Sequence, residues 1–419
     1  LVLAQSAHSN LVILPSESSF NIITIQSLGG INFRQFLSTI KMVLYVVCVA
    51  IVLAPALAFS GLGTTVAKKL VSHDSSSLRR SLNMVSERTR LEFQKSNAMS
   101  SQTGGAGGSS SLQGLERLDD SWEKLRNGGW KNAPPTIVKE FDREVEVTSC
   151  STFDIAVCGG TLGIFYALAF QKQGKKVCIV ERGKVAGRPQ EWNISGKEMN
   201  VFIDLGIFSR EEIDSCIAIE FNPVRVGFKT DTSAKANIIP KGEEGYQFEL
   251  YTKDVLNLGI LPSKIIALAK TKFEEMGGVI YENQGLNKID VYKNMACLTL
   301  QEAKADPPPT PEEAALLPTQ MVQSRCVIDC MGNASPISKQ IRGPVEPDGV
   351  CIVVGGCARG FKPENNTYSD LIYTDTPITR EKGDGKKSAL QYFWEAFPTG
   401  SGPGDRTTYL FTYVNMGYI

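Results

Sequence analysis

Histidine is almost absent from this chain of 419 residues. The only two, His8 and His73, lie in an N-terminal stretch that we interpret below as removed from the mature protein. A body without histidine excludes Ser-His-Asp and Cys-His nucleophiles and argues against a zinc enzyme. Proton transfer would then rely on Asp, Glu, Tyr, Lys, Cys or a cofactor, and we expect no metal site.

Net charge is also absent, because 44 Lys and Arg balance 44 Asp and Glu. Nothing in this balance favours nucleic acid or an anionic membrane as the main partner. The ten cysteines do not form metal-binding pairs: Cys326 and Cys330 are four apart, Cys351 and Cys357 six apart, and neither spacing is that of a zinc knuckle. We expect free, mostly buried thiols in a reducing compartment.

The N-terminal region contains two predicted targeting segments, which together span residues 42–112. Residues 1–41 show no coherent pattern and are interpreted as a non-native upstream segment. Residues 42–58 form an apolar run that ends in a small-x-small cleavage site, which is typical of a signal peptide. Residues 59–112 are rich in Ser, Arg, Lys and Gly and predict a transit peptide and disordered linker. The pair predicts delivery to a plastid (chloroplast), and a secreted protein with a disordered spacer is the alternative.

The stretch from Phe153 to Arg182 predicts a strand, a glycine turn, a helix, a second strand and an acid. The turn comprises Cys158, Gly159, Gly160, Thr161, Leu162 and Gly163, and the acid is Glu181. In a dinucleotide site the glycines let the backbone approach the pyrophosphate, the helix N-terminus offers N–H groups, and the acid holds a ribose hydroxyl. Because Cys158 stands at the first glycine position, an ordinary βαβ unit with closely packed glycines is the alternative.

The rest of the chain predicts a mixture of helices and strands. A helix with an apolar stripe is expected within 113–149, two short helices begin at the capping boxes of Ser195 and Ser209, and a longer helix begins at Pro262. The alternation over 287–301 predicts a hairpin, and Phe221 to Phe228 predicts a loop and an edge strand.

Two further features complete the pattern. A strand that begins near Arg325 ends at Asp329 and Gly332, and the runs 389–397 and 407–414 predict a long antiparallel hairpin.

Residues 150–415 resemble the plant and algal plastid flavoproteins described as lycopene beta/epsilon cyclase-like. The matching stretches include VCGGTLGIF (157–165), FNPVRVGF (221–228), DVLNLGILPSK (254–264), VIDCMGNASPISKQIRG (327–343), DGVCIVVGGCARGF (348–361) and YFWEAFPTGSGPGDRTTYLFTYV (392–414). The resemblance implies an α/β fold: a Rossmann-like FAD-binding domain over 150–342 and an interleaved α+β antiparallel-sheet substrate region over 343–419. It also implies a Gly-Asp motif beyond Ile419, so we expect a C-terminally truncated chain.

The same resemblance implies FAD as cofactor, with NAD(P)H as a candidate reductant. FAD would contact the glycine turn from Cys158 to Gly163 and also Glu181, Arg182, Arg188, Asp329 and Gly332. The substrate would be a lipophilic isoprenoid, carotenoid or other pigment, with peripheral association to the thylakoid. The alternative is a flavoprotein-derived binding or assembly factor without turnover. An NAD-dependent dehydrogenase is a third hypothesis that the sequence supports less.

Two side chains have a competing interpretation. The Phe-Leu-Glu-Glu-Thr motif of lycopene cyclases is absent, and Glu395 is the nearest candidate for the catalytic acid. Its alternative is a strand carboxylate paired with an arginine such as Arg406. Arg188 either meets a cofactor phosphate through its fork of donors or is a surface or capping residue.

Overall fold

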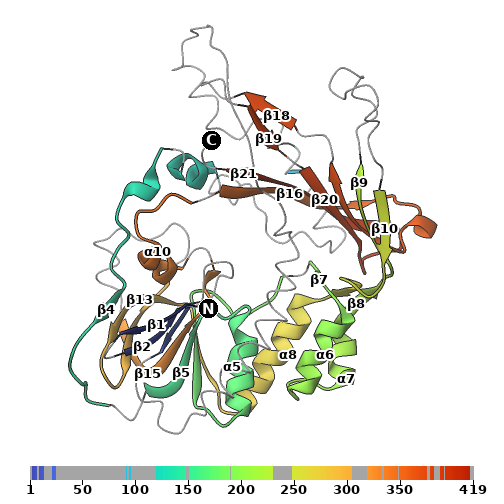
Figure 1. Cartoon of the computed structure of the whole chain (residues 1–419). Helices are drawn as coiled ribbons and strands as arrows, with labels where there is room; N and C mark the ends of the chain where they lie inside the picture. The colour runs from blue at the N-terminus through green and yellow to red at the C-terminus, as the bar shows by residue number, and fades with distance from the viewer. Residues whose placement is uncertain are drawn as a thin grey trace, which may run out of the picture.

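The computed structural model describes residues 2–6, 9–13, 21–24, 91, 94–95, 119–125, 127–147, 151–188, 190–229, 248–303, 319–332, 335–347, 349–374, 378–381, 387–390 and 392–415. Two sheets dominate these residues. A mixed sheet with helices against it lies at the bottom of Figure 1, and an antiparallel-rich sheet lies across from it. The fold is therefore α/β with a second, β-rich region.

The larger sheet has eight strands, of which seven follow the order β12-β6-β5-β15-β14-β13-β4, and the short β3 pairs with β15. Its parallel part consists of β12, β6, β5 and β15, which is the arrangement that βαβ units generate. The strands are β3 (Asn21–Thr24), β4 (Val138–Glu140), β5 (Thr152–Cys158), β6 (Val177–Glu181), β12 (Val279–Glu282), β13 (Gln284–Val291), β14 (Ala296–Glu302) and β15 (Thr319–Asp329).

The predicted glycine unit forms as the sequence indicates. β5 leads through the turn into helix α5 (Gly163–Lys172), and β6 returns parallel to β5. Gly174, with φ of 77°, follows the helix in the left-handed conformation that glycine adopts readily. Helix α8 (Pro262–Glu275) then carries the chain to β12.

Both faces of this sheet are covered. On one face α5 and α8 pack against β5 and β6 through fully buried side chains such as Ile155, Ile179, Leu168 and Phe273. On the other face the hairpin β13–β14 contributes Ile289 and Leu298 to a second core, to which α10 (Pro336–Arg342) adds its own side chains. Strands buried on both faces explain the continuous apolar runs of β5 and β6.

A small three-stranded sheet and two short helices follow β6. The sheet has the order β7-β11-β8 and is antiparallel. Both predicted capping boxes form, with Ser195–Glu198 at the start of α6 and Ser209–Glu212 at the start of α7. The elements are β7 (Trp192–Ile194), α6 (Gly196–Asp204), α7 (Arg210–Cys216), β8 (Ile217–Glu220) and β11 (Leu258–Ile260).

The second large sheet has six strands in the order β10-β9-β17-β20-β21-β16. They are β9 (Val224–Lys229), β10 (Phe248–Thr252), β16 (Gly349–Arg359), β17 (Ser369–Thr374), β20 (Tyr392–Pro398) and β21 (Asp405–Asn415). The predicted hairpin forms from β20 and β21. The short 3-10 helix η4 (Pro363–Asn365) precedes β17, and a separate ribbon pairs β18 (Ile378–Glu381) with β19 (Lys387–Leu390).

Two predictions about this sheet need correction. The boundary predicted at residue 343 does not separate the two sheets, because β9 and β10 join strands that follow residue 349. The strand β9 is also not an edge strand, since it lies between β10 and β17. Both errors have the same cause, which is that β9 pairs with a strand more than 140 residues later in the chain.

The N-terminal region contributes several short elements. β1 (Val2–Ser6) pairs with β2 (Ser9–Ile13), and β3 pairs antiparallel with β15, although all three belong to the segment interpreted as upstream of the native start. Residues 119–125 are helical, η1 (Gly129–Lys131) follows, and β4 extends the larger sheet beside β13. The predicted signal peptide and nearly all of the predicted transit peptide lie outside the described residues. Among the helices that the structure describes, none is long and apolar enough to span a bilayer.

Candidate functional site

The carboxyl ends of three neighbouring parallel strands meet at one edge of the larger sheet. In the strand register Asp329 of β15 pairs with Cys158 of β5, and Cys158 pairs with Val180 of β6. Glu181 is the next residue of β6. The structure thus brings the glycine turn, Glu181 and Asp329 together, at the edge where open α/β sheets bind their ligands.

The conformation of the turn requires its glycines. Gly159 has φ of 98°, and a Cβ there would lie 2.5 Å from the carbonyl oxygen of Cys330. A Cβ on Gly163 would lie 2.7 Å from Cγ1 of Val157, so this glycine lets α5 approach β5 closely. A Cβ on Gly160 would lie 2.5 Å from Cγ2 of Val185. All three glycines are therefore explained by contacts within the protein.

The carboxylate of Glu181 closes the turn. Its Oε2 accepts a hydrogen bond from the backbone N–H of Gly160 at 2.7 Å, and its Oε1 accepts one from Gly183 at 2.8 Å. Each carboxylate oxygen has two lone pairs, so these bonds leave acceptor capacity for a further donor. The acid therefore lies at the glycine turn, where a ribose hydroxyl would donate to it.

The N-terminus of α5 carries no side-chain cap. Leu162 occupies the N-cap position, no side chain bonds to the cap, and the first turn contains no acid. The N-terminus of a helix bears its positive dipole end. Here the N–H of Ile164 donates to the carbonyl of Gly160 at 3.0 Å, so the dipole rather than this N–H would act on an anion. With an exposed Thr161 in front and Glu181 beside the turn, these residues fit the adenosine-pyrophosphate end of a dinucleotide.

Asp329 organises the chain that follows β15. Its Oδ1 accepts from the N–H of Met331 at 3.0 Å, and its Oδ2 accepts from the hydroxyls of Ser335 at 2.5 Å and Ser338 at 3.4 Å. Burial raises the pKa of Asp329, while these three donors oppose the rise. Gly332, with φ of 67°, lets the chain reverse before Ser335 caps α10. Both predicted residues thus lie at the site edge and shape it.

Cys158 and Cys330 adjoin the same edge as inert thiols. The N–H of Cys330 donates to the carbonyl of Cys158 at 2.7 Å. Burial, followed by the charge of Asp329, raises the pKa of both thiols. A thiol that resists ionisation is a poor nucleophile, so Cys158 acts as a small apolar side chain in the first glycine position. All eight cysteines in the described part of the chain are free.

The two arginines predicted to contact FAD, Arg182 and Arg188, lie in different surroundings. Arg182 follows Glu181 directly and is exposed. Arg188 is also exposed and its Nη2 donates to the carbonyl of Glu191 at 3.5 Å. Arg188 also acts on Tyr409 of β21, whose pKa burial raises and Arg188 lowers. The loop of Arg188 therefore reaches the second sheet, where Gln190 donates to the Tyr409 hydroxyl.

Glu395 lies on the six-stranded sheet, apart from the glycine turn. Burial raises the pKa of this carboxyl from 4.5 to about 7. Arg406 does not pair with Glu395: it pairs with Asp370 at 2.7 Å, and Asp370 also accepts from Nε of Arg225 at 2.6 Å. The two side chains point to opposite faces, since Glu395 pairs with Tyr409 and successive residues of a strand alternate.

Sequence reasoning missed two features of this sheet. One is the buried cluster of Arg225, Asp370 and Arg406, for which no local pattern exists. The other is a row of aromatic side chains across the strands, which the alternation of aromatic residues over 392–413 signals in part.

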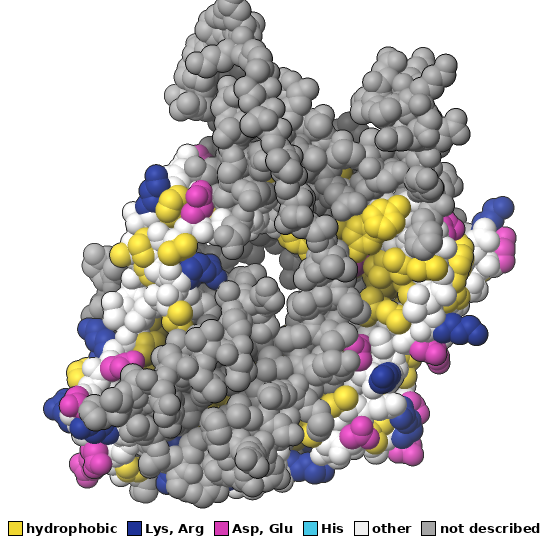
Figure 2. Space-filling model, viewed as in Figure 1, with side chains coloured by type: hydrophobic (Ala, Val, Ile, Leu, Met, Phe, Trp, Pro, Cys, Tyr) yellow, Lys and Arg dark blue, Asp and Glu magenta, His cyan; other side chains and the backbone are white. Residues whose placement is uncertain are grey.

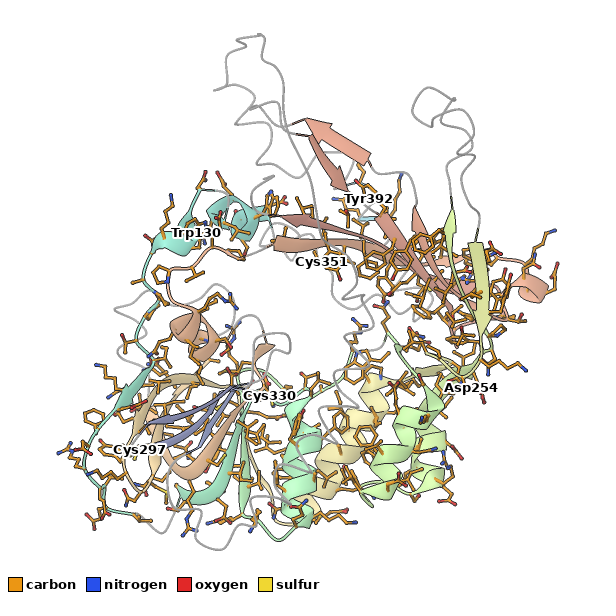
Figure 3. The ribbon with its side chains drawn as sticks, viewed as in Figure 1. Trp130, Asp254, Cys297, Cys330, Cys351 and Tyr392 are labelled. Carbon is orange, nitrogen blue, oxygen red and sulfur yellow. The ribbon has the colours of Figure 1, made fainter. Side chains whose placement is uncertain are left out.

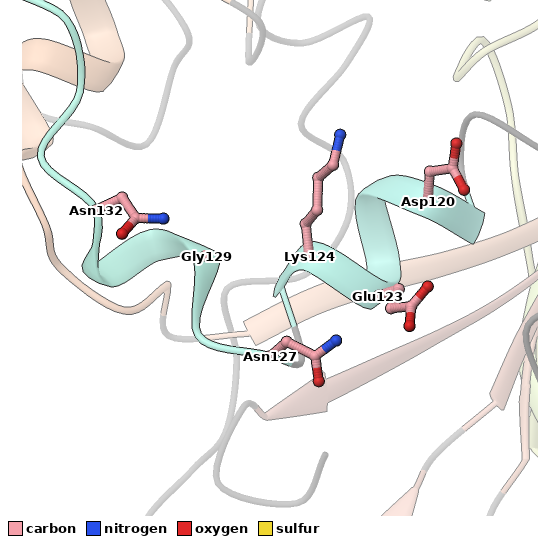
Figure 4. A pocket seen from close by; sticks show the side chains of 6 residues that line it. All are labelled: Asp120, Glu123, Lys124, Asn127, Gly129 and Asn132. Carbon is pink, nitrogen blue, oxygen red and sulfur yellow. The ribbon is translucent and has the colours of Figure 1, made fainter. Parts of the chain in front are cut away.

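A separate cavity of about 530 Å³ lies beside the N-terminal helix. Figure 4 shows its lining, in which Lys124 and Glu123 extend from the helix in different directions. None of its lining residues belongs to the glycine turn or to the six-stranded sheet; they are Asp120, Glu123, Lys124, Asn127, Gly129 and Asn132.

Comparison with known proteins gives distant structural neighbours only. No family model and no curated protein matches the chain. Solved structures that resemble it include a flavoprotein/dehydrogenase from Cytophaga hutchinsonii, with 14% identity and a TM-score of 0.40 over 62% of this chain and 55% of that one. Another is the p-nitrophenol 4-monooxygenase PnpA from Pseudomonas putida DLL-E4, with 13% identity and a TM-score of 0.41 over 62% and 57%.

A third neighbour is a geranylgeranyl bacteriochlorophyll reductase-like protein from Thermoplasma acidophilum, with 15% identity and a TM-score of 0.36 over 64% and 58%. The matches span less than two thirds of each of these three proteins. The strand order and the glycine turn of this chain define the class by themselves, namely a Rossmann-type α/β fold. The resemblance to the lycopene cyclase-like family stays a prediction.

Proposed function

We propose that the chain binds FAD at the β5–α5–β6 unit and acts as a flavin-dependent oxidoreductase. One observation carries the proposal: the glycine turn, the uncapped N-terminus of α5 and the carboxylate of Glu181 meet at the carboxyl ends of parallel strands. The exposed Thr161 would face the pyrophosphate, and Glu181 would accept from the ribose. Bound FAD supplies hydride or electron transfer, which the side chains of this chain cannot provide.

The finer parts of the proposal concern substrate and location. A lipophilic isoprenoid or pigment-type substrate in a plastid is supported by the sequence resemblance and by the two-part N-terminal composition. The apolar side chains of the six-stranded sheet provide a surface of suitable character, with Phe228, Leu250 and Tyr413 more than 40% exposed. Glu395 would hold a proton on this surface, since burial raises its pKa to about 7. NAD(P)H remains the candidate reductant.

FAD binding is tested by titrating the purified full-length chain against FAD and following the quenching of flavin fluorescence. We expect the Glu181→Gln variant to bind FAD roughly 10- to 100-fold more weakly, because a hydrogen bond to a charged acceptor contributes about 1.5–3 kcal/mol. Glu220→Gln, which alters an exposed carboxyl at the end of β8, is the matched control. Circular dichroism and a urea midpoint for each variant separate loss of binding from loss of folding.

One observation favours a second candidate, a binding or assembly factor without turnover. Each glycine of the turn is already required by a neighbouring protein atom, so the glycines alone do not demand a cofactor. If the folded wild-type chain neither retains flavin nor quenches FAD fluorescence, the oxidoreductase proposal fails and this second candidate stands.

A further inference from the structure

One face of the six-stranded sheet bears a continuous row of aromatic rings. The ring centroids of Phe228 and Tyr373 are 5.5 Å apart, those of Tyr373 and Phe393 5.3 Å, and those of Phe393 and Phe411 4.6 Å. Tyr413 stacks on Phe393 at 5.8 Å. These five residues, here called the aromatic row, come from β9, β17, β20 and β21, and their separations are those of favourable ring pairs.

The row remains accessible at its two ends. Phe228 is 41% exposed and Tyr413 51% exposed, whereas Phe393 in the middle is 5% exposed. Figure 2 shows hydrophobic side chains gathered on this side of the molecule, over the region of β9, β10 and β20. A flat molecule can therefore extend the stack at either end without displacing the rings in the middle.

Glu395 shares the face of the aromatic row. It lies two residues after Phe393 on β20, and its neighbours in the register are Leu371 on β17 and Tyr409 on β21. Within the described residues no hydrogen bond or ion pair reaches its carboxyl. The side chain of Glu395 is partly buried, so the face offers one donor or acceptor that a ligand can satisfy.

The titratable groups around Glu395 come from three strands. They are Tyr373 on β17, Tyr409 and Tyr413 on β21, and Cys351 on β16. Burial raises the pKa of each, and the carboxylate charge of Glu395 adds to the rise. Arg188 and Glu191 act on Tyr409 from the loop before β7. Apart from the opposite charges of Arg188 and Glu191 the surroundings are neutral hydroxyls, a thiol and rings, which favours a neutral ligand over a phosphate or a carboxylate.

This face is turned toward the half of the molecule that carries the glycine turn. Gln190 donates to the hydroxyl of Tyr409, and the N–H of Gly400 donates to Oε1 of Glu191 at 3.1 Å. Figure 3 shows Cys330 at the end of β15 and Cys351 on β16 on opposite sides of the interval between the sheets.

We propose that the aromatic row and Glu395 bind a flat conjugated molecule that carries a carbonyl oxygen, such as an enone, quinone or aryl ketone. The rings stack on the conjugated system, and the protonated carboxyl of Glu395 donates its hydrogen bond to the carbonyl oxygen. A pure hydrocarbon would leave that donor unsatisfied. The inference depends on the proposed function only in treating the bound molecule as a substrate. It narrows the proposed pigment-type substrate to one that carries oxygen.

The test compares 9-fluorenone with fluorene, which have the same ring system and differ in the carbonyl. Equilibrium dialysis of the full chain without FAD at pH 6 should show roughly tenfold tighter binding of fluorenone, the effect of one hydrogen bond. The preference should vanish at pH 8, because the deprotonated carboxyl of Glu395 repels the carbonyl oxygen. Equal affinity for the two ligands, or a preference independent of pH, would overturn the inference.

Variants assign the effect to residues. Glu395→Gln keeps a donor, so it should retain the preference for fluorenone at both pH values, whereas Glu395→Ala should abolish it. Phe393→Leu should lower the affinity for both ligands by the same factor, and Glu220→Gln should bind them as the wild type does. A urea midpoint confirms folding of each variant. Loss of the preference in Glu395→Gln at pH 6 would contradict the assigned donor.

The two proposals fail separately. If FAD binds and fluorenone does not, the substrate inference is wrong and the proposed flavin site stands. If fluorenone binds with the expected pH dependence and FAD does not, the flavin site is wrong and the aromatic row stands as a binding surface.

Discussion

The ionisation of Glu395 predicts how the stability of the protein depends on pH. Burial raises the pKa of this carboxyl from 4.5 to about 7 in the folded chain. Between these values the folded state holds a proton that the unfolded state has lost, so the stability contributed by the protonated form is fully present below pH 4.5 and is lost as pH rises through 7. At 1.36 kcal/mol per pKa unit, the loss is about 3 kcal/mol.

The Glu395→Gln variant isolates this contribution, because glutamine has nearly the same shape and does not ionise. Urea unfolding at pH 5, 6, 7 and 8 should show that the wild type loses about 2.5 kcal/mol in free energy of unfolding relative to the variant, with most of the loss below pH 7. Taking the difference removes other carboxyls, such as Asp405, whose pKa the Arg359 hydrogen bond lowers. Parallel stability curves for the two proteins would refute the argument.

Two further substitutions probe packing and charge. Gly163→Ala should destabilise the chain by about 1–3 kcal/mol and weaken FAD retention, because the new Cβ would lie 2.7 Å from Cγ1 of Val157; urea midpoints and flavin content measure both effects. Arg406→Met should cost about 1.5–3 kcal/mol alone, because it removes a charged hydrogen bond to Asp370, which keeps its contact with Arg225. A double-mutant cycle with Asp370→Leu should recover part of that loss, and strict additivity would contradict the assigned pair.

The sequence was sufficient for those parts of the fold that local signals specify. The glycine turn, both capping boxes and the β20–β21 hairpin depend on residues close together in the chain, and all of them form as predicted. Asp329 was predicted from its place at a strand end, and the register with Cys158 places it beside the turn. No sequence pattern predicted that Asp329 would accept hydrogen bonds from Ser335 and Ser338.

The composition of the second sheet could not be predicted, because its pairing is nonlocal. β9 and β17 pair in parallel although Val224 and Ser369 are 145 residues apart in sequence. Apolar alternation marks each strand, but it does not say which partner a strand takes. The predicted pairing of Glu395 with Arg406 is wrong for the same reason. The two residues are close in sequence, but the antiparallel register places their side chains on opposite faces of the sheet.

The loop after β6 connects the two halves of the molecule and is held by hydrogen bonds at both of its ends. Its first residues are held at the glycine turn, where Glu181 binds the N–H of Gly183 and Glu282 binds that of Val185 at 2.8 Å. Its last residues are held at the second sheet through Gln190 and Glu191. One oxygen of Glu191, Oε2, is buried there without a partner among the described residues, so this contact is retained at an energetic cost. A short segment anchored at both ends fixes where the Glu395 face lies relative to the turn, which neither sheet could determine alone.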